Sequence, residues 1–125
     1  ERGGLITRTR QGLLYLSRSL STTLRDLEDA ATRAAHFDQV VLEVQRSFDY
    51  YESHFRQAPI RSLALAPLPF EAAAFTDYLG ANLNAQVKSI QLAQLIEVQG
   101  ELPPALQMSC LTALGAALRQ EVKAL

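Results

Sequence analysis

The stretch LEVQRSFDYYESHF, residues 42–55, places four aromatic rings and three carboxylates within fourteen residues. It belongs to a longer stripe of apolar residues that recur at steps of four and three: Phe37, Val41, Val44, Phe48, Tyr51 and Phe55. This spacing predicts one amphipathic helix over residues 31–56. The polar side chains between these positions are expected to face solvent: Asp38, Glu43, Gln45, Asp49 and Glu52. Because an apolar, strand-like run follows soon afterwards, the helix is expected to pack against a sheet.

The residues before this helix predict a β-hairpin. Two runs with alternating side chains lie on either side of Gln11-Gly12 within residues 4–20. A glycine between two alternating runs is typical of a tight turn that joins antiparallel strands. Residues 21–33 are polar and predict a connection with one helical turn.

The residues after the long helix predict further strands and helices. The run RSLALAPL, residues 61–68, is short, apolar and ended by prolines, which favours a buried central strand. A helix is expected over 70–83, with Phe70, Ala74, Tyr78 and Leu79 inward, and a strand over 87–92. Gly100 marks a turn, and Pro103-Pro104 opens a last helix, because proline is tolerated in a first helical turn.

This order of elements predicts an α/β fold in which helices cover a mixed sheet that includes the hairpin. The chain begins at Glu1 rather than at methionine. We interpret residues 1–125 as a single-domain fragment.

The composition indicates a soluble globular protein and excludes several function classes. Hydrophobic residues make up 48% of the 125 residues, charged residues make up 20%, and the net charge is −1. A nucleic-acid-binding surface is not expected, because there is no excess of basic residues. Cys110 is the single cysteine, which excludes an internal disulfide framework and predicts a buried core residue. No apolar run approaches the roughly 18 residues that a membrane span needs.

The sequence predicts neither a catalytic nor a metal site. His36 and His54 would lie roughly 27 Å apart along one helix, at 1.5 Å per residue. Cys110 has no base near it in the sequence, and the carboxylates have no evident partner that would shift their pKa values. We therefore expect no metal and no enzymatic activity.

The turn after the third strand could hold a phosphate, since it lies between a strand and a helix. Its residues argue against this: Ala66, Pro67, Leu68 and Pro69 include two prolines, which lack N–H donors, and no glycine. We interpret it as a degenerate nucleotide turn and expect no cofactor.

Several stretches together resemble the PilM and MshI group of type IV pilus assembly proteins. They are EVQRSFDYYES at 43–53, YLGANLN at 78–84, ALGAALR at 113–119 and the strand LLYLSRSL at 13–20. The resemblance covers nearly the whole chain, and the string around QRSFDYY is its most specific part. It implies the C-terminal part of an actin-like ATPase fold, as a ribonuclease-H-like subdomain of the second half. In PilM relatives a Gly-Gly turn approaches ATP where Ala66 and Pro67 stand here.

The resemblance also implies a role and partners. These proteins are non-catalytic scaffolds of pilus biogenesis, in this case of the MSHA-like system, located in the cytoplasm and peripheral to the inner membrane. Their partners include other pilus-biogenesis proteins and a bitopic inner-membrane protein with a short cytoplasmic tail.

Two alternatives stay open: a nucleotide-binding half of an actin-like ATPase, and a generic α/β interaction module. Two further contacts are expected from the residues themselves. Arg46 and Tyr50 lie off the apolar stripe and are candidates for contact with a partner or a neighbouring subdomain. An exposed sheet edge could join copies of the chain into a homo-oligomer.

Overall fold

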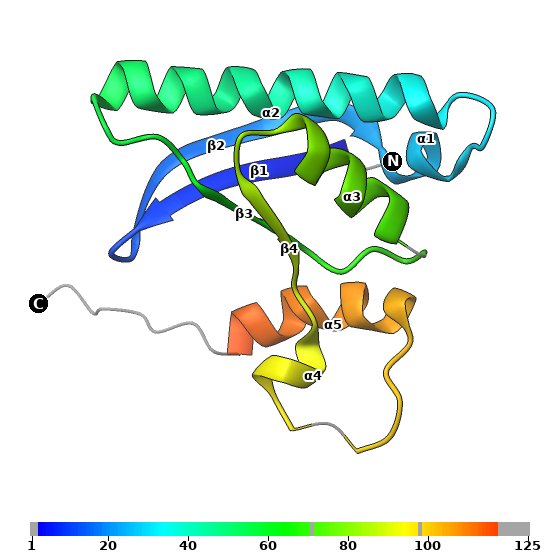
Figure 1. Ribbon diagram of the computed structural model, residues 1–125. Coiled ribbons are helices and arrows are strands. Elements are labelled where there is room, and N and C mark those ends of the chain that lie inside the picture. Colours follow the sequence, from blue (N-terminus) through cyan, green and yellow to red (C-terminus); the bar gives the residue numbers. More distant parts are fainter. Residues whose placement is uncertain (1–2, 71, 98, 118–125) are drawn as a thin grey trace, which may run out of the picture.

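The computed structural model describes residues 3–70, 72–97 and 99–117. Its elements follow in this order: β1 (Gly3–Arg10), β2 (Leu13–Thr23), α1 (Leu24–Glu28), α2 (Arg33–Phe55), β3 (Ser62–Leu65), α3 (Ala73–Asn82), β4 (Gln86–Ser89), α4 (Leu92–Leu95) and α5 (Pro104–Ala117). The long helix α2 lies across the hairpin, with α3 beside the strands β3 and β4 (Figure 1). The predicted α/β class is confirmed, and so is the predicted order of strands and helices, to which the structure adds the short helix α4.

The predicted hairpin is confirmed, and the conformation of its turn explains why a glycine lies between the two strands. β1 and β2 are antiparallel, and Gln11 and Gly12 between them have φ values of 50° and 76°. Two positive φ values match the two-residue turns whose twist fits that of a hairpin. A bulge in the register between Arg8 and Thr9 leaves Tyr15 as the extra residue of β2.

The apolar stripe of α2 builds the centre of the core. Phe37, Val44, Phe48 and Tyr51 are buried. The ring of Tyr15 meets those of Tyr51 and Phe55 edge to face, with centroids 6.1 Å and 5.5 Å away. The helix therefore packs on the hairpin, as the stripe predicts.

The expectation that Glu43 faces solvent is wrong. The Glu43 side chain is only 7% exposed, and its carboxylate accepts hydrogen bonds from the backbone N–H and the hydroxyl of Ser21 in β2. A buried carboxylate is tolerated when hydrogen bonds replace its hydration. Glu52 is half-buried as well and accepts a bond from the backbone N–H of Ile60 at 3.1 Å.

The prediction of a buried central strand over residues 61–68 is also wrong. The strand β3 spans four residues, and its side chains alternate between exposed and half-buried. It pairs in parallel with β4. Among the described residues there are two separate two-stranded sheets, β1–β2 and β3–β4, rather than one mixed sheet. Neither β1 nor β3 has a second strand beside it there, so β3 is an edge strand.

Helix α3 differs from the prediction in the residues that it buries. Phe75 and Leu79 are buried, whereas Ala74 is exposed and Phe70 and Tyr78 are half-buried. Gly80 lies within the helix, which ends at Asn82. The Phe37 and Phe75 rings, 4.9 Å apart, join α2 to α3.

The last elements form a small layer of their own. The strand expected over 87–92 ends at Ser89, and Leu92 begins the short helix α4. The amide of Gln107 in α5 connects the layer: it accepts from the Leu92 N–H at 3.3 Å and donates to the Leu102 carbonyl at 2.9 Å. In Figure 1 these two helices lie below β4, away from α2.

Candidate interaction surface

The outward face of α2 carries an unusual group of side chains. Leu42, Arg46, Tyr50 and His54 follow one another at steps of four residues, which places them on one face of a helix. All four are exposed, and Leu42 and Tyr50 are each 51% exposed. We call these four residues the α2 surface. The solvent side of an amphipathic helix is ordinarily polar, so two large apolar side chains there need an explanation.

The ring of Tyr50 is held in place by its neighbours. It stacks on the ring of His54, with centroids 5.0 Å apart and planes 11° apart. His54 in turn meets Phe55 edge to face at 4.9 Å, and Phe55 packs against the core. The tyrosine is therefore exposed but supported, an arrangement that lowers the entropic cost of binding a partner.

The structure places Arg46 and Tyr50, the two contact residues suggested by the sequence, on this exposed face. Tyrosine and arginine are the residue types that most often dominate the energy of protein interfaces. Leu42 and His54 were missed by the sequence argument. The four-residue step that joins them to Arg46 and Tyr50 was the signal that could have found them.

The turn Ala66–Pro69 lies between β3 and α3, as expected. Ala66 is exposed, Pro67 is buried, and Leu68 and Pro69 are half-buried. Helix α3 begins only at Ala73, and its cap residue Ala72 makes no side-chain capping bond. Pro67 and Pro69, which cannot donate a backbone hydrogen bond, occupy the segment that would have to offer N–H groups to a phosphate.

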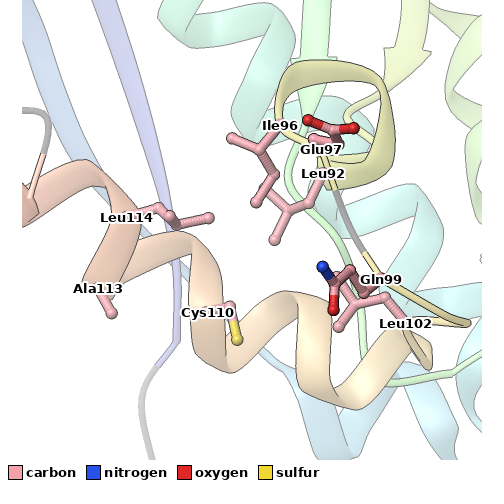
Figure 2. A pocket seen from close by; sticks show the side chains of 8 residues that line it. All are labelled: Leu92, Ile96, Glu97, Gln99, Leu102, Cys110, Ala113 and Leu114. Carbon is pink, nitrogen blue, oxygen red and sulfur yellow. The ribbon is translucent and has the colours of Figure 1, made fainter.

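A cavity of about 520 Å³ opens between α4 and α5 (Figure 2). Its walls are mainly apolar: Leu92, Ile96, Glu97, Gln99, Leu102, Cys110, Ala113 and Leu114. Cys110 is free and half-buried at this cavity, so the prediction of a fully buried core cysteine is wrong. Among the described residues of the lining, Glu97 is the single charged one, and none of them is a histidine, lysine or arginine that could activate the thiol.

Besides Glu43, Asp26 and Tyr78 have shifted pKa values, and in both the main cause is a hydrogen bond that connects parts of the fold. Hydrogen bonds from the backbone N–H and hydroxyl of Thr23, the N-cap of α1, lower the pKa of Asp26, which completes the capping box of that helix. A hydrogen bond to Asp38 raises the pKa of Tyr78 and ties α3 to α2. None of these groups lines the cavity.

Within the described part of the chain there is no group of three or more metal-ligating side chains. No helix in that part is both long and apolar enough to cross a membrane. Comparison of the chain with models of known protein families, with curated proteins and with solved structures found no match.

Proposed function

We propose that this chain is a non-catalytic assembly scaffold of type IV pilus biogenesis, of the MSHA-like kind, acting in the cytoplasm at the inner membrane. The observation that carries the proposal is the string EVQRSFDYYES at 43–53. On α2 this string supplies both the packing residues Phe48 and Tyr51 and the exposed pair Arg46 and Tyr50. Its resemblance to the PilM and MshI group therefore involves core and surface positions alike.

The order of elements supports the finer assignment to an actin-like, ribonuclease-H-like subdomain. An antiparallel hairpin is followed by a long covering helix, and then by two parallel strands joined through α3. We propose that the chain forms part of the second half of such a fold.

A scaffold is favoured over an ATPase because of the turn after β3. Pro67 and Pro69 cannot donate a backbone hydrogen bond, and the turn contains no glycine that would let a phosphate approach the backbone. In our proposal the chain acts through contacts, with Arg46 and Tyr50 on the binding side. Its partners are other pilus-biogenesis proteins, including a bitopic inner-membrane protein with a short cytoplasmic tail.

Two experiments test this function. The first replaces the native gene in the source cells by the variants R46A/Y50A and R33A, and measures surface pilin by immunoblot after shearing. We expect the double variant to lose most of the surface pilin. R33A is the matched control, because Arg33 is an exposed arginine at the other end of α2. Full piliation in the double variant would contradict the assigned contact, and full piliation after deletion of the gene would contradict the function.

The second experiment measures the binding of Mg²⁺-ATP by calorimetry, for this chain and for the full-length protein. We expect no binding by either. Binding by the full-length protein would instead favour the actin-like ATPase as the function.

A further inference from the structure

The tip of the hairpin exposes two adjacent leucines. Leu13 and Leu14 directly follow the turn at Gln11-Gly12 and are 63% and 61% exposed. In Figure 1 this turn lies at the end of the molecule where α2 ends, opposite to α1. Large apolar side chains in contact with water gain free energy when an apolar medium covers them, so two of them side by side at a turn mark a contact surface.

The two leucines lie on opposite faces of the hairpin. Side chains alternate along a strand, and Leu13 pairs with Arg10, whereas Leu14 pairs with Thr9. The face that carries Arg10 is turned toward the end of α2, because Arg10 donates a hydrogen bond to Gln57 at 2.7 Å. A protein that covers one face of the hairpin would therefore reach one leucine only. A medium that surrounds the tip reaches both.

The charges of the hairpin fit a negatively charged medium. Its strands and turn, residues 3–23, contain three arginines, Arg8, Arg10 and Arg18, and no acidic residue. Arg56 directly follows α2, is exposed, and is adjacent in sequence to the residue that Arg10 contacts. Arginine side chains are attracted to anionic lipids, and their apolar stems can lie along acyl chains while the guanidinium stays at the phosphates.

The tip is held in place by contacts with the core. The ring of Tyr15, the residue after Leu14, meets the rings of Tyr51 and Phe55 edge to face. The bond from Arg10 to the segment after α2 fixes the end of the neighbouring strand. The tip is thus presented in one orientation, which lowers the entropic cost of binding.

We propose that the hairpin tip inserts into the surface of an anionic lipid bilayer. Leu13 and Leu14 reach the upper acyl chains, and Arg10 and Arg56 lie among the headgroup phosphates. The insertion is shallow, because the backbone groups of the turn need water or phosphate as hydrogen-bond partners. This surface differs from the α2 surface. The inference goes beyond the proposed function, in which a protein partner brings the chain to the membrane.

The first test is cosedimentation of the purified chain with phosphatidylcholine vesicles that contain about 30% phosphatidylglycerol as anionic lipid. We expect binding that the variant L13S/L14S weakens roughly tenfold or more, because it removes the inserted apolar surface. The matched control L5S/L95S replaces two leucines that are 64% and 67% exposed and lie away from the tip, in β1 and α4. It should bind like the unmodified chain, and circular dichroism verifies that both variants are folded.

Charge reversal tests the arginines separately. R10E/R56E should weaken binding roughly tenfold, and vesicles of phosphatidylcholine alone should bind the unmodified chain weakly. The control R33E/K88E changes the net charge equally, at two exposed residues in α2 and β4. It should bind the anionic vesicles like the unmodified chain.

A tryptophan at the tip distinguishes insertion from adsorption by charge alone. The chain contains no tryptophan, so L14W introduces a single fluorescent reporter. Its emission should shift to shorter wavelengths when the anionic vesicles are added, and lipids brominated in the upper acyl chain should quench it. L5W reports from the other part of β1 and should show neither change.

The proposal would be overturned by absence of binding to the anionic vesicles, by equal binding of L13S/L14S, or by an unchanged emission of L14W. Without vesicle binding, dimerisation that L13S/L14S abolishes would assign the tip to a second copy of the chain. A loss of surface pilin in L13S/L14S without vesicle binding would assign it to a protein partner, and both outcomes overturn the lipid contact. Because the vesicle experiments use the isolated chain, their failure leaves the scaffold function standing, and full piliation after deletion of the gene leaves the lipid contact standing.

Discussion

Glu43 and Ser21 join the middle of α2 to β2 through a single carboxylate. The Ser21 backbone N–H donates to Oε2 at 3.0 Å, the Ser21 hydroxyl donates to Oε1, and the amide of Gln39 donates to Oε1 at 2.9 Å. These bonds replace the water that the buried carboxylate has lost. An acidic residue in the helix thus acts as an anchor for the sheet.

We predict that E43A is the most destabilising replacement of a carboxylate on α2. It leaves the Ser21 N–H without its acceptor, so the free energy of unfolding should fall by about 2 kcal/mol. The control D49A removes an exposed carboxylate that accepts a hydrogen bond from Gln45. It should lower the free energy of unfolding by less than about 0.5 kcal/mol. Urea denaturation followed by circular dichroism measures both. Equal losses in the two variants would mean that Glu43 does not anchor the helix.

The same contact predicts a loss of stability in acid. Burial raises the pKa of Glu43, but hydrogen bonds from Ser21 and Gln39 and the charge of Arg18 outweigh it, so the pKa lies below its ordinary value of 4.5. A carboxylate with a lowered pKa binds protons more readily in the unfolded chain, so its contribution is complete above pH 4.5 and is lost as the pH falls below. E43Q cannot titrate at this position. The difference in unfolding free energy between the unmodified chain and E43Q should therefore shrink below that pH, and a constant difference would contradict the assignment.

The helix α2 could be predicted because one local pattern determines which of its residues are buried. The steps of four and three placed Phe48 and Tyr51 inward and Tyr50 outward, as observed. The burial of Glu43 could not be predicted in this way. Its partner Ser21 lies in a strand that the local pattern of the helix does not describe, and nothing in the residues around Glu43 shows that this strand passes over it.

The pairing of the strands was predicted less well for the same reason. The apolar run at 61–68 does not reveal how many strands lie beside it, and β3 has one neighbour among the described residues. The α2 surface was found in part, because helical position alone separates Arg46 and Tyr50 from the stripe. The stacking of His54 on Tyr50 depends on side-chain conformations that the spacing does not define.

Replacing glycine by alanine should have opposite effects at two positions. Gly12 has a φ of +76°, and Gly80 lies in α3 with no positive φ; an added Cβ would meet nothing within 4 Å at either place. G12A should destabilise the hairpin by about 1 kcal/mol, because an L residue is strained in this region. G80A should stabilise the chain by roughly 0.5–1 kcal/mol, since alanine is the better helix former. Thermal unfolding measures both, and the same sign for both would contradict the turn geometry.

Substitutions of the adjacent residues Tyr50 and Tyr51 should distinguish an effect on binding from an effect on folding. Tyr51 is 1% exposed and Tyr50 is 51% exposed, although the two differ by one position on the same helix. Y51A removes a ring packed against Tyr15 and Phe55 and should lower the free energy of unfolding by about 3–5 kcal/mol. Y50A should change it by less than about 0.5 kcal/mol.

If the α2 surface binds a partner, Y50A should leave the fold intact and still weaken pilus assembly. Its far-UV spectrum and melting temperature would match those of the unmodified chain, while surface pilin would fall. L42A provides a second test, because Leu42 is equally exposed and does not stack on His54. Should Y50A and L42A both assemble pili normally, the apolar residues of α2 would have no role in binding. A loss of surface pilin in Y50A but not in L42A would locate the contact at the Tyr50 ring.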